Sequence, residues 1–472
     1  MKIDGTKDQR AAAAIRCVAG PQCVKRCRPS VKCCTKVQMR QTLNADVLHN
    51  LRHTDMLLGT TVTFVCTSRP EMPERGRRKA LGRPANLRSA MPKLGRLCES
   101  KLLQIFAGLA CLFIFNEFLV FYLVVLTSCR WSEIAPSNAN SEEVTRAFVI
   151  ADTHLLGIRK GHWFDKLRRE WQMHRSFKSA VSILQPNAVF FLGDVFDEGQ
   201  WSMPDEFKEY VERFEELFEV SDSTQRFVVA GNHDLGFHYA IFPQRVDWFS
   251  RFFNRTKLVD HVTVGENHFV LLNSMAMERD GCRLCSDAER ELKELSDAFD
   301  CASRNSSKCR TKYSIGATYS RPILMQHFPL YRKNDLECAD DLDLSPEKIR
   351  KTAFREKWEC LSEDSTKDLI RLLKPRAAFG GHTHFGCQKW WSEAVAFWEY
   401  SVSSFSWRNT PLPAILLLSI TPQSIEVSKC LLPNEYTVIG LYMTAGIAVL
   451  VVLLMPCFRK LRRSSRKSEK HL

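Results

Sequence analysis

The central part of this 472-residue chain lacks any excess of positive charge, although the formal net charge of the whole chain is +14. Residues 1–101 carry +14 and residues 457–472 carry +6, which leaves −6 on residues 102–456. A nucleic-acid-binding domain needs a basic face for the phosphate backbone. We therefore expect no nucleic-acid partner and assign the basic excess to two tails.

Long apolar runs are scarce, and the sequence has two of them. Residues 102–126 form a 25-residue run that contains Glu117, and residues 438–455 form an 18-residue run without charge. Both lengths suit a transmembrane helix. A cleaved signal peptide is the alternative for the first run, but the run is too long and too far from the start of the chain. A buried core helix is the alternative for the second run.

Basic residues flank both runs on their outer sides, and such flanks stay in the cytosol. This pattern predicts cytosolic tails at residues 1–101 and 456–472 and a luminal domain at residues 130–436. Glycosylation sequons at Asn254 and Asn305 fit a luminal domain. Glu117 costs a few kcal/mol in a bilayer unless it is protonated or faces a partner. The sequence leaves open whether it contacts another membrane protein or is tolerated by a shift of the helix.

Residues 1–90 lack any sustained helical or strand period. They are expected to be a disordered tail or sequence upstream of the true start. Met91 opens a short basic lead into the first apolar run, so we take a start at Met91 as a hypothesis.

The segment from residue 129 to residue 430 lacks an even number of cysteines, because it contains nine. At least one of them therefore has no partner within the chain. Cys282 and Cys285 have the spacing of half a zinc site or of a redox pair. An oxidising lumen favours structural disulfides within residues 282–309 instead. We expect residues 276–318 to be a cysteine-stapled insertion.

From residue 146 onward, β-rich apolar runs alternate with helical patterns, which predicts an α/β fold in layers. Strands are expected at 147–151, 188–192, 226–230, 268–272, 322–326, 377–379, 396–405 and 414–430, and helices at 164–184 and 204–219.

Five short blocks of oxygen and imidazole ligands follow predicted strands, where α/β folds build their sites. In Asp-x-His and His-x-His, both ligands lie on one side of an extended backbone. The mixed oxygen and nitrogen set favours manganese, iron or zinc over calcium. Two such cations cleave phosphate esters. The metal ligands expected are Asp152, His154, Asp194, Asn232, His327, His382 and His384.

These blocks resemble the motifs of the calcineurin-like metallophosphoesterases over residues of about 145–425: Asp-x-His, Gly-Asp, Gly-Asn-His-Asp/Glu, His and Gly-His-x-His. The resemblance implies a four-layer α/β sandwich with catalytic residues His233 and Asp234. His233 would protonate or stabilise the leaving oxygen, and Asp234 would orient His233. It assigns one cation to Asp152, His154, Asp194 and His384, and the second to Asp194, Asn232, His327 and His382.

Two departures separate the chain from the protein phosphatases of this superfamily. Those enzymes carry Gly-Asp-x-x-Asp-Arg-Gly, whereas Glu198 stands here in place of the Arg. A carboxylate at that place would repel a phosphate dianion more than a diester monoanion. They also usually carry Gly-Asn-His-Glu, whereas this chain has Asp234. Both departures count against a protein phosphatase, and Glu198 favours a diester substrate.

Segments outside the metal blocks resemble the GPI-anchor-remodelling metallophosphoesterases of animals: residues 162–173, 236–239 and 405–409, within a similarity of about 93–458. The apolar spacing in residues 162–173 by itself predicts a packed helix face, and Trp407 and Arg408 could line the pocket. The resemblance implies Mn²⁺ and one membrane span on each side of the luminal domain.

The same resemblance implies removal of the ethanolamine-phosphate side branch from the second mannose of protein-linked GPI anchors. This step promotes exit from the endoplasmic reticulum with cargo receptors. It implies residence at ER exit sites, the ER–Golgi intermediate compartment and the Golgi. The alternatives are a luminal phosphodiesterase acting on a phospholipid or nucleotide, and a non-catalytic cargo-sorting adaptor. The complete ligand set argues against the adaptor.

Overall fold

The computed structural model describes residues 91–134, 143–254, 258–304, 311–316, 319–339 and 343–468. The expectations for residues 1–90 therefore lie outside the described residues. The described residues, from Met91 onward, form a single compact unit.

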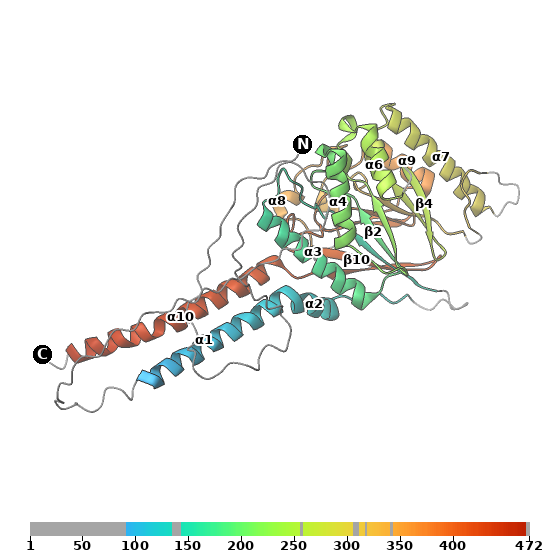
Figure 1. Cartoon of the computed structure of the whole chain (residues 1–472). Helices are drawn as coiled ribbons and strands as arrows, with labels where there is room; N and C mark the ends of the chain where they lie inside the picture. The colour runs from blue at the N-terminus through green and yellow to red at the C-terminus, as the bar shows by residue number, and fades with distance from the viewer. Residues whose placement is uncertain are drawn as a thin grey trace, which may run out of the picture. The chain divides into compact units, whose positions relative to one another are not determined.

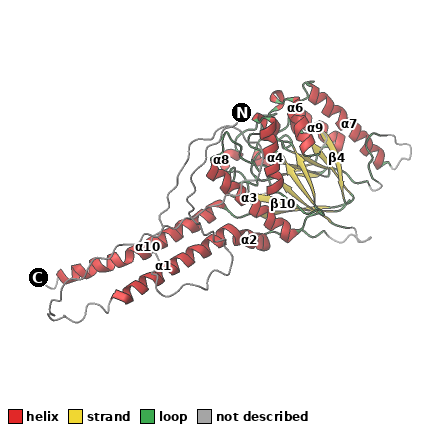
Figure 2. Ribbon diagram, viewed as in Figure 1, coloured by secondary structure: helices red, strands yellow, loops and turns green. Residues whose placement is uncertain are grey.

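The described strands form two mixed sheets (Figures 1 and 2). The first has the order β11-β10-β1-β2-β3, in which β1, β2 and β3 are parallel and β10 and β11 are antiparallel neighbours. Its strands are β1 (Thr145–Ile150), β2 (Ala188–Leu192), β3 (Gln225–Val229), β10 (Ala414–Ile420) and β11 (Ile425–Leu431).

The second sheet has the order β4-β5-β6-β7-β9-β8, with β5, β6, β7 and β9 parallel. Antiparallel β4 and β8 form its edges. Its strands are β4 (Val259–Val264), β5 (Asn267–Leu272), β6 (Ile323–Gln326), β7 (Ala377–Gly380), β8 (Cys387–Trp391) and β9 (Phe397–Ser401).

The two sheets pack face to face through a shared apolar layer. Phe190 of β2 stacks against Phe227 of β3 and also contacts Phe269 of β5 in the other sheet. Alternate residues of each strand point to opposite faces, so the neighbouring Phe191 points outward to the helices. Both faces of the central strands are thus buried, which explains their continuous apolar runs.

Helices cover the outer faces of both sheets. On the first sheet, Phe177 of α3 (Trp163–Leu184) and Phe214 of α4 (Pro204–Leu217) contact Phe191. On the second sheet, α7 (Arg283–Ser303) packs against β4 and α9 (Glu363–Leu373). The short α5 (Asn232–Leu235), α6 (Pro243–Phe252) and α8 (Glu347–Arg350) lie in the connections.

The predicted α/β alternation is confirmed, with three differences. Residues 414–430 are a hairpin rather than one strand, and the edge strands β4 and β8 were not predicted because polar residues interrupt them. The segment 276–318 contains α7, whose Leu292, Leu295 and Phe299 follow a helical period into the core. Cys301 there is disulfide-bonded, whereas Cys282 and Cys285 are not.

Two described helical segments are long and apolar enough to cross a membrane. The first, Lys101–Ser128, comprises the end of α1 (Met91–Ile114), a π-helical turn (Phe115–Leu119) and α2 (Val120–Ser128). The second, Glu435–Pro456, begins α10 (Glu435–Ser468). These bounds cover both runs expected from the sequence.

Glu117 lies in the π-helical turn and finds its partner inside the chain. The hydroxyl of Tyr442 in α10 donates to Glu117 Oε1 at 2.6 Å. The indole of Trp171 in α3 donates to the Glu117 carbonyl at 3.3 Å. A π-helical turn redirects side chains locally. The structure therefore gives Glu117 a contact between this chain's own two apolar helices.

Two disulfides are resolved between described cysteines. Cys129–Cys430 joins the end of α2 to β11, and Cys338–Cys387 joins the loop after β6 to β8. Cys360 is buried and free, as the odd cysteine count requires of at least one residue. The first disulfide fixes the point at which the apolar helices meet the first sheet.

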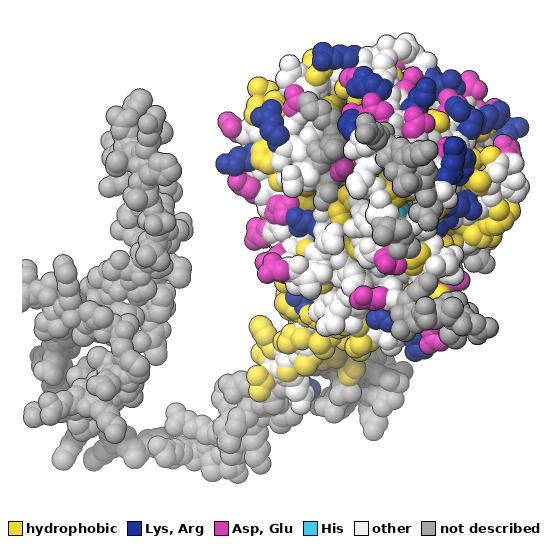
Figure 3. Space-filling model, turned by 90° about the vertical axis from the view of Figure 1, so that its right-hand side faces the viewer, with side chains coloured by type: hydrophobic (Ala, Val, Ile, Leu, Met, Phe, Trp, Pro, Cys, Tyr) yellow, Lys and Arg dark blue, Asp and Glu magenta, His cyan; other side chains and the backbone are white. Residues whose placement is uncertain are grey.

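The amino-terminal end of α3 departs from the packed helix face expected from its spacing. Trp171 packs edge-to-face on Phe118 of the π-helical turn. Trp163, Phe164 and Leu167 are exposed instead. On the face in Figure 3, acidic and basic side chains are interspersed over the globular part.

Candidate metal centre

All five ligand blocks follow strands at one edge of the two packed sheets. Asp152 and His154 follow β1, Asp194 follows β2, and Asn232 begins α5 after β3. From the second sheet, His327 follows β6, and His382 and His384 follow β7. Since neighbouring parallel strands end at the same edge, the fold brings the seven expected metal ligands together.

The backbone at the ligands is unusual. Five of them, Asp152, His154, Asp194, His382 and His384, have φ between 44° and 71°. Non-glycine residues rarely adopt this left-handed region, and they persist there where surrounding structure enforces it, commonly at functional sites. The strain here turns carboxylates and imidazoles toward one centre.

Asp194 occupies the middle of the cluster. Its Oδ2 lies 3.6 Å from His154 Nε2 and 3.4 Å from His327 Nε2, so one carboxylate faces both halves. On one side, His384 Nε2 lies 3.6 Å from Asp152 Oδ1. On the other, His327 Nε2 lies 3.1 Å from Asn232 Oδ1. Ligand atoms of Asp152, His154 and His384 form one compact group, and those of Asp194, His327 and His382 form another.

Three imidazoles are each held so that one ring nitrogen faces the centre and the other is bonded outside it. His154 Nδ1 lies 3.2 Å from Asp197 Oδ1, His327 Nδ1 2.8 Å from the Leu192 carbonyl, and His382 Nε2 2.7 Å from the Trp358 carbonyl. Because these oxygens only accept, each such nitrogen donates its proton. The other nitrogen can then offer its lone pair once a cation takes the place of a proton, as in metal-ligating histidines.

A second observation supports the fit of cations to these residues. Asp152 Oδ1 is buried and has no hydrogen-bond partner, and a polar atom in that state is costly unless a ligand satisfies it. His154 Nε2 and His384 Nε2 lie 3.2 Å apart beside it. The donor set of carboxylate, amide and imidazole groups fits two borderline divalent cations.

The electrostatics divide the histidines into two kinds. Burial disfavours the charged form of His154, but the neighbouring carboxylates of Asp152 and Asp197 raise its pKa to about 10. Burial likewise opposes the charge on His327, while Asp194 raises its pKa to about 9. Burial, with repulsion from His327, lowers the pKa of His382 to about 3. Cations at the centre would displace the protons that the carboxylates hold on His154 and His327.

Two glycines allow the strands' ends to approach this closely. Gly193 has φ +86°, and a Cβ there would lie 2.7 Å from His327 Nδ1. A Cβ at Gly231 would collide with the Asp194 carboxylate. Side chains at these two places would therefore push apart the ligand-bearing loops.

His233 lies at the open side of the centre and is partly exposed. Its backbone N–H donates to Asp194 Oδ1 at 2.7 Å, and its Nδ1 donates to the Asp197 carbonyl at 2.9 Å. Nε2 is left as the nitrogen that can exchange a proton with a bound molecule.

The expectation that Asp234 orients His233 was wrong. The buried Asp234 carboxylate accepts N–H bonds from Phe196 at 2.9 Å and Gly231 at 2.8 Å, so it fixes the ligand-bearing loops. The two residues are consecutive in the helical turn α5, and consecutive helical side chains do not face each other. The backbone of Asp197 orients His233 instead.

Asp197 is a functional residue that the sequence reasoning did not single out. Its buried carboxylate lies beside His154, and Arg408 Nη2 donates to Asp197 Oδ2 at 3.0 Å. Lys160 Nζ is 4.0 Å from the same oxygen. Asp197 is the second Asp of the Gly-Asp-x-x-Asp pattern, and this position in the motif could have identified it from the sequence. Arg408 thus reaches the edge of the centre, whereas Trp407 is buried against Phe121.

The argument from Glu198 also needs correction. Glu198 is fully buried, and its two oxygens accept the backbone N–H groups of Arg159 and Lys160 at 2.9 and 2.6 Å. Burial beneath the 157–160 loop turns the carboxylate away from a bound phosphate. The charge of Glu198 therefore does not distinguish phosphate monoesters from diesters as substrates.

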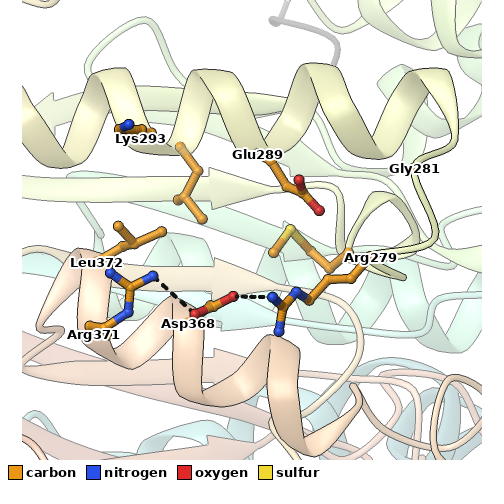
Figure 4. Close-up of a pocket in the computed structure, with 9 residues that line it drawn as sticks. Arg279, Gly281, Glu289, Lys293, Asp368, Arg371 and Leu372 are labelled. Atoms are coloured by element: carbon orange, nitrogen blue, oxygen red, sulfur yellow. Dashed lines mark hydrogen bonds and ion pairs between the residues drawn. The ribbon is translucent and has the colours of Figure 1, made fainter.

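Aromatic side chains border the centre beside His382. Phe237 and Trp358 have ring centroids 4.8 Å apart, and Tyr239 lies 6.4 Å from Trp358. Tyr239 and Trp358 are both exposed. A separate cavity of about 420 Å³ between α7 and α9 is lined by Arg279, Asp368 and Arg371 among others, and none of the ligands borders it (Figure 4).

Comparisons with known proteins agree with this geometry. The family model described as calcineurin-like phosphoesterase matches residues 145–386. "Metallophosphoesterase 1 homolog" of Caenorhabditis elegans is 43% identical over 359 residues, which are 75% of this chain and 92% of that protein. "Metallophosphoesterase 1" of Gallus gallus is 42% identical over 380 residues, 79% of this chain and 93% of that protein.

A solved structure of a dimetal phosphatase from Danio rerio is 13% identical, with a TM-score of 0.37, covering 61% of this chain and 96% of that one.

Proposed function

The chain belongs to the calcineurin-like phosphoesterase family, and from that premise we propose that it is a membrane-anchored phosphodiesterase of GPI anchors. The reaction is removal of the ethanolamine-phosphate side branch from the second mannose of protein-linked anchors. The observation that carries the proposal is the central position of Asp194 between two complete groups of ligand atoms. Metal-dependent phosphoester hydrolysis is the activity of the family.

The seven ligands would hold two divalent cations, most suitably Mn²⁺, with Asp194 shared between the groups. Bound there, such a pair supplies an activated water and neutralises phosphoryl oxygens. His233 then acts on the leaving oxygen through Nε2, because its Nδ1 is held by the Asp197 carbonyl. Asp197 keeps His154 in the tautomer that the site needs.

The charges beside the centre suit a diester. Arg408 and Lys160 both face the Asp197 carboxylate, so their charge is already shared with an anion. A phosphate monoester dianion gains more from free cationic side chains than a diester monoanion does. The pairing at Asp197 therefore supports a singly charged phosphodiester substrate.

The border of the centre suits a glycan. The exposed rings of Tyr239 and Trp358 stand beside His382, whose Nε2 donates to the Trp358 carbonyl. Flat aromatic faces pack on sugar rings and attract ammonium groups such as that of ethanolamine. Residues 236–239, which carry part of this border, also carry the resemblance to GPI-remodelling enzymes.

The two apolar helices support a membrane-bound enzyme. They flank the domain in sequence, and Cys129–Cys430 joins their neighbouring ends to the first sheet. We propose a luminal domain with both termini cytosolic, resident at ER exit sites, the ER–Golgi intermediate compartment and the Golgi. GPI-anchored proteins would be its substrates, with cargo receptors of the ER-to-Golgi route as partners.

Cells that lack this protein provide the test. They are complemented with wild type, with Asp194→Ala, or with Asp335→Asn as a control at a buried carboxylate outside the centre. Purified GPI glycans are then analysed by mass spectrometry. We expect the side branch to be lost with wild type and the control and retained with Asp194→Ala. Equal side-branch content in all cells would refute the GPI substrate and favour another phosphodiester. Rescue by Asp194→Ala would favour the non-catalytic adaptor.

A further inference from the structure

A second group of metal-binding side chains lies outside the centre just described. His238, Asp280, Cys282 and Cys285 each place one ligand atom within 4.8 Å of the others. They come from the short helical turn His238–Ala240 and from the start of α7. The disulfides expected in this segment do not include either cysteine, because both are free.

The distances fit a tetrahedral cation. Cys282 Sγ lies 3.9 Å and Cys285 Sγ 3.7 Å from His238 Nδ1. A zinc ion bound to sulfur at about 2.3 Å and to nitrogen at about 2.0 Å holds those two atoms about 3.6 Å apart. The three side chains already stand close to this separation.

Asp280 sets the orientation of the imidazole. Its Oδ2 lies 2.8 Å from His238 Nε2, and its Oδ1 accepts the N–H of Cys282 at 3.0 Å. The carboxylate is a stronger acceptor than the Met275 carbonyl, which lies 3.3 Å from Nδ1. The ring proton therefore resides on Nε2, and the Nδ1 lone pair faces the two sulfurs, as in a carboxylate–histidine–metal arrangement.

The start of α7 holds one of the two sulfurs against a backbone donor. Cys282 is the N-cap of α7, and its Sγ accepts the N–H of Cys285 at 3.0 Å. Burial and the neighbouring Cys282 side chain raise the pKa of the Cys285 thiol, so this proton leaves only when a cation binds. Arg279 and Gly281, both with positive φ, form the turn that leads into the helix (Figure 4).

We propose that His238, Cys282 and Cys285 bind a zinc ion, with Asp280 positioning the histidine and water completing the coordination. Thiolate ligands select zinc over manganese, so this site and the sulfur-free dinuclear centre would take different metals. Binding releases the two thiol protons to solvent. The proposed ion joins α7 to the loop after His233. It lies beside Met275, and the neighbouring Ser274 accepts the N–H of Phe328.

The experiment uses full-length protein purified in mild detergent without reductant or added metal. Zinc per chain is measured by elemental mass spectrometry for wild type, Cys282→Ser, Cys285→Ser and the control Cys111→Ser at an exposed free cysteine. Zinc at the dinuclear centre would be common to all four proteins. We expect about one zinc fewer per chain in both site variants than in wild type and the control. Asp280→Asn, which keeps the thiols, should weaken zinc retention against a chelator about 10- to 100-fold.

Cobalt provides a readout that does not require any variant to fold. Wild-type protein stripped and reloaded with Co²⁺ should show a thiolate-to-cobalt charge-transfer band, which the oxygen and nitrogen ligands of the dinuclear centre cannot produce. Recovery of Cys282 and Cys285 as a disulfide in the untreated protein would overturn the proposal and indicate a redox pair. Equal zinc in wild type and both site variants, or no such cobalt band, would also overturn it.

Discussion

Substitution of Asp197 by Asn tests how the dinuclear centre is held. The change keeps the shape of the side chain and removes its charge beside His154 Nδ1 at 3.2 Å and Arg408 Nη2 at 3.0 Å. His233 Nδ1 donates to the Asp197 carbonyl at 2.9 Å, which the substitution leaves in place, and lies 3.6 Å from the Asp197 carboxylate, beyond hydrogen-bond distance. We therefore expect weaker cation binding with little change in the leaving-group step.

The size of the effect follows from the contacts. An outer carboxylate that fixes a metal-ligating histidine contributes a factor of about 10–100 in metal affinity. That factor corresponds to about 1.4–2.8 kcal/mol. The Asn side-chain oxygen still accepts a hydrogen bond from His154, but this neutral bond is weaker by about 1 kcal/mol than the bond to a carboxylate. The remaining loss of metal-binding free energy comes from Arg408, which is left without its charged partner.

The assay is a Mn²⁺ titration of phosphodiester hydrolysis by the full-length protein, with free Mn²⁺ followed by electron paramagnetic resonance. Asp197→Asn should raise the half-saturating Mn²⁺ concentration about 10- to 100-fold and leave kcat at saturating metal within a few-fold of wild type. Asp335→Asn is the matched control, since Asp335 is also buried and pairs with Arg332 away from the ligands. An unchanged metal affinity in Asp197→Asn, or an equal shift in the control, would refute the reasoning.

Three further predictions concern stability. Cys430→Ala opens the Cys129–Cys430 disulfide, which spans 301 residues, and should lower the free energy of unfolding by at most about 6 kcal/mol. Denaturation measurements should show a smaller loss in bilayers, where the inserted helices still hold the loop ends together, than in detergent, where they no longer do. Tyr442→Phe removes the donor to Glu117 and should lower thermal stability by about 1–2 kcal/mol, and an unchanged melting temperature would contradict the assigned contact. Burial, with repulsion from a neighbouring histidine, lowers the pKa of His261 to about 4, below its unfolded value of 6.5. Its contribution to stability is therefore complete above pH 6.5 and is lost as the pH falls toward 4, so His261→Gln should show a smaller loss of unfolding free energy between pH 7 and pH 5 than wild type.

The sequence was sufficient to predict that the expected ligands lie together, because each block directly follows a buried strand. Asp152, Asp194 and His327 could be named without knowing which strands pair, since parallel strands of an α/β fold end at one edge. The type of these side chains and their position after a strand both predicted a metal site at this edge of the sheets. The two sheets then place the blocks together as expected.

The orientation of side chains could not be read in this way. Asp197 and Arg408 are 211 residues apart, and no local pattern predicts their contact. Glu198 and Asp234 were assigned roles by position in a motif, but each carboxylate is turned to backbone N–H groups by the loop that carries it. Burial and backbone hydrogen bonding decided these cases, and both depend on tertiary structure.

The exposed residues of α3 show the same limit. Trp163, Phe164 and Leu167 have the spacing of a core face, yet all three side chains are exposed. Helical spacing predicts which side chains share a face and leaves open what that face meets.

The central claim is tested most directly by the reaction itself. Purified full-length protein with Mn²⁺ is incubated with a GPI-anchored protein that carries the ethanolamine-phosphate side branch, and the glycan and the released product are identified by mass spectrometry. We predict loss of the branch with wild type, and retention with Asp194→Asn or after removal of metal by a chelator. An intact side branch under conditions in which the same protein cleaves a simple phosphodiester would contradict the account.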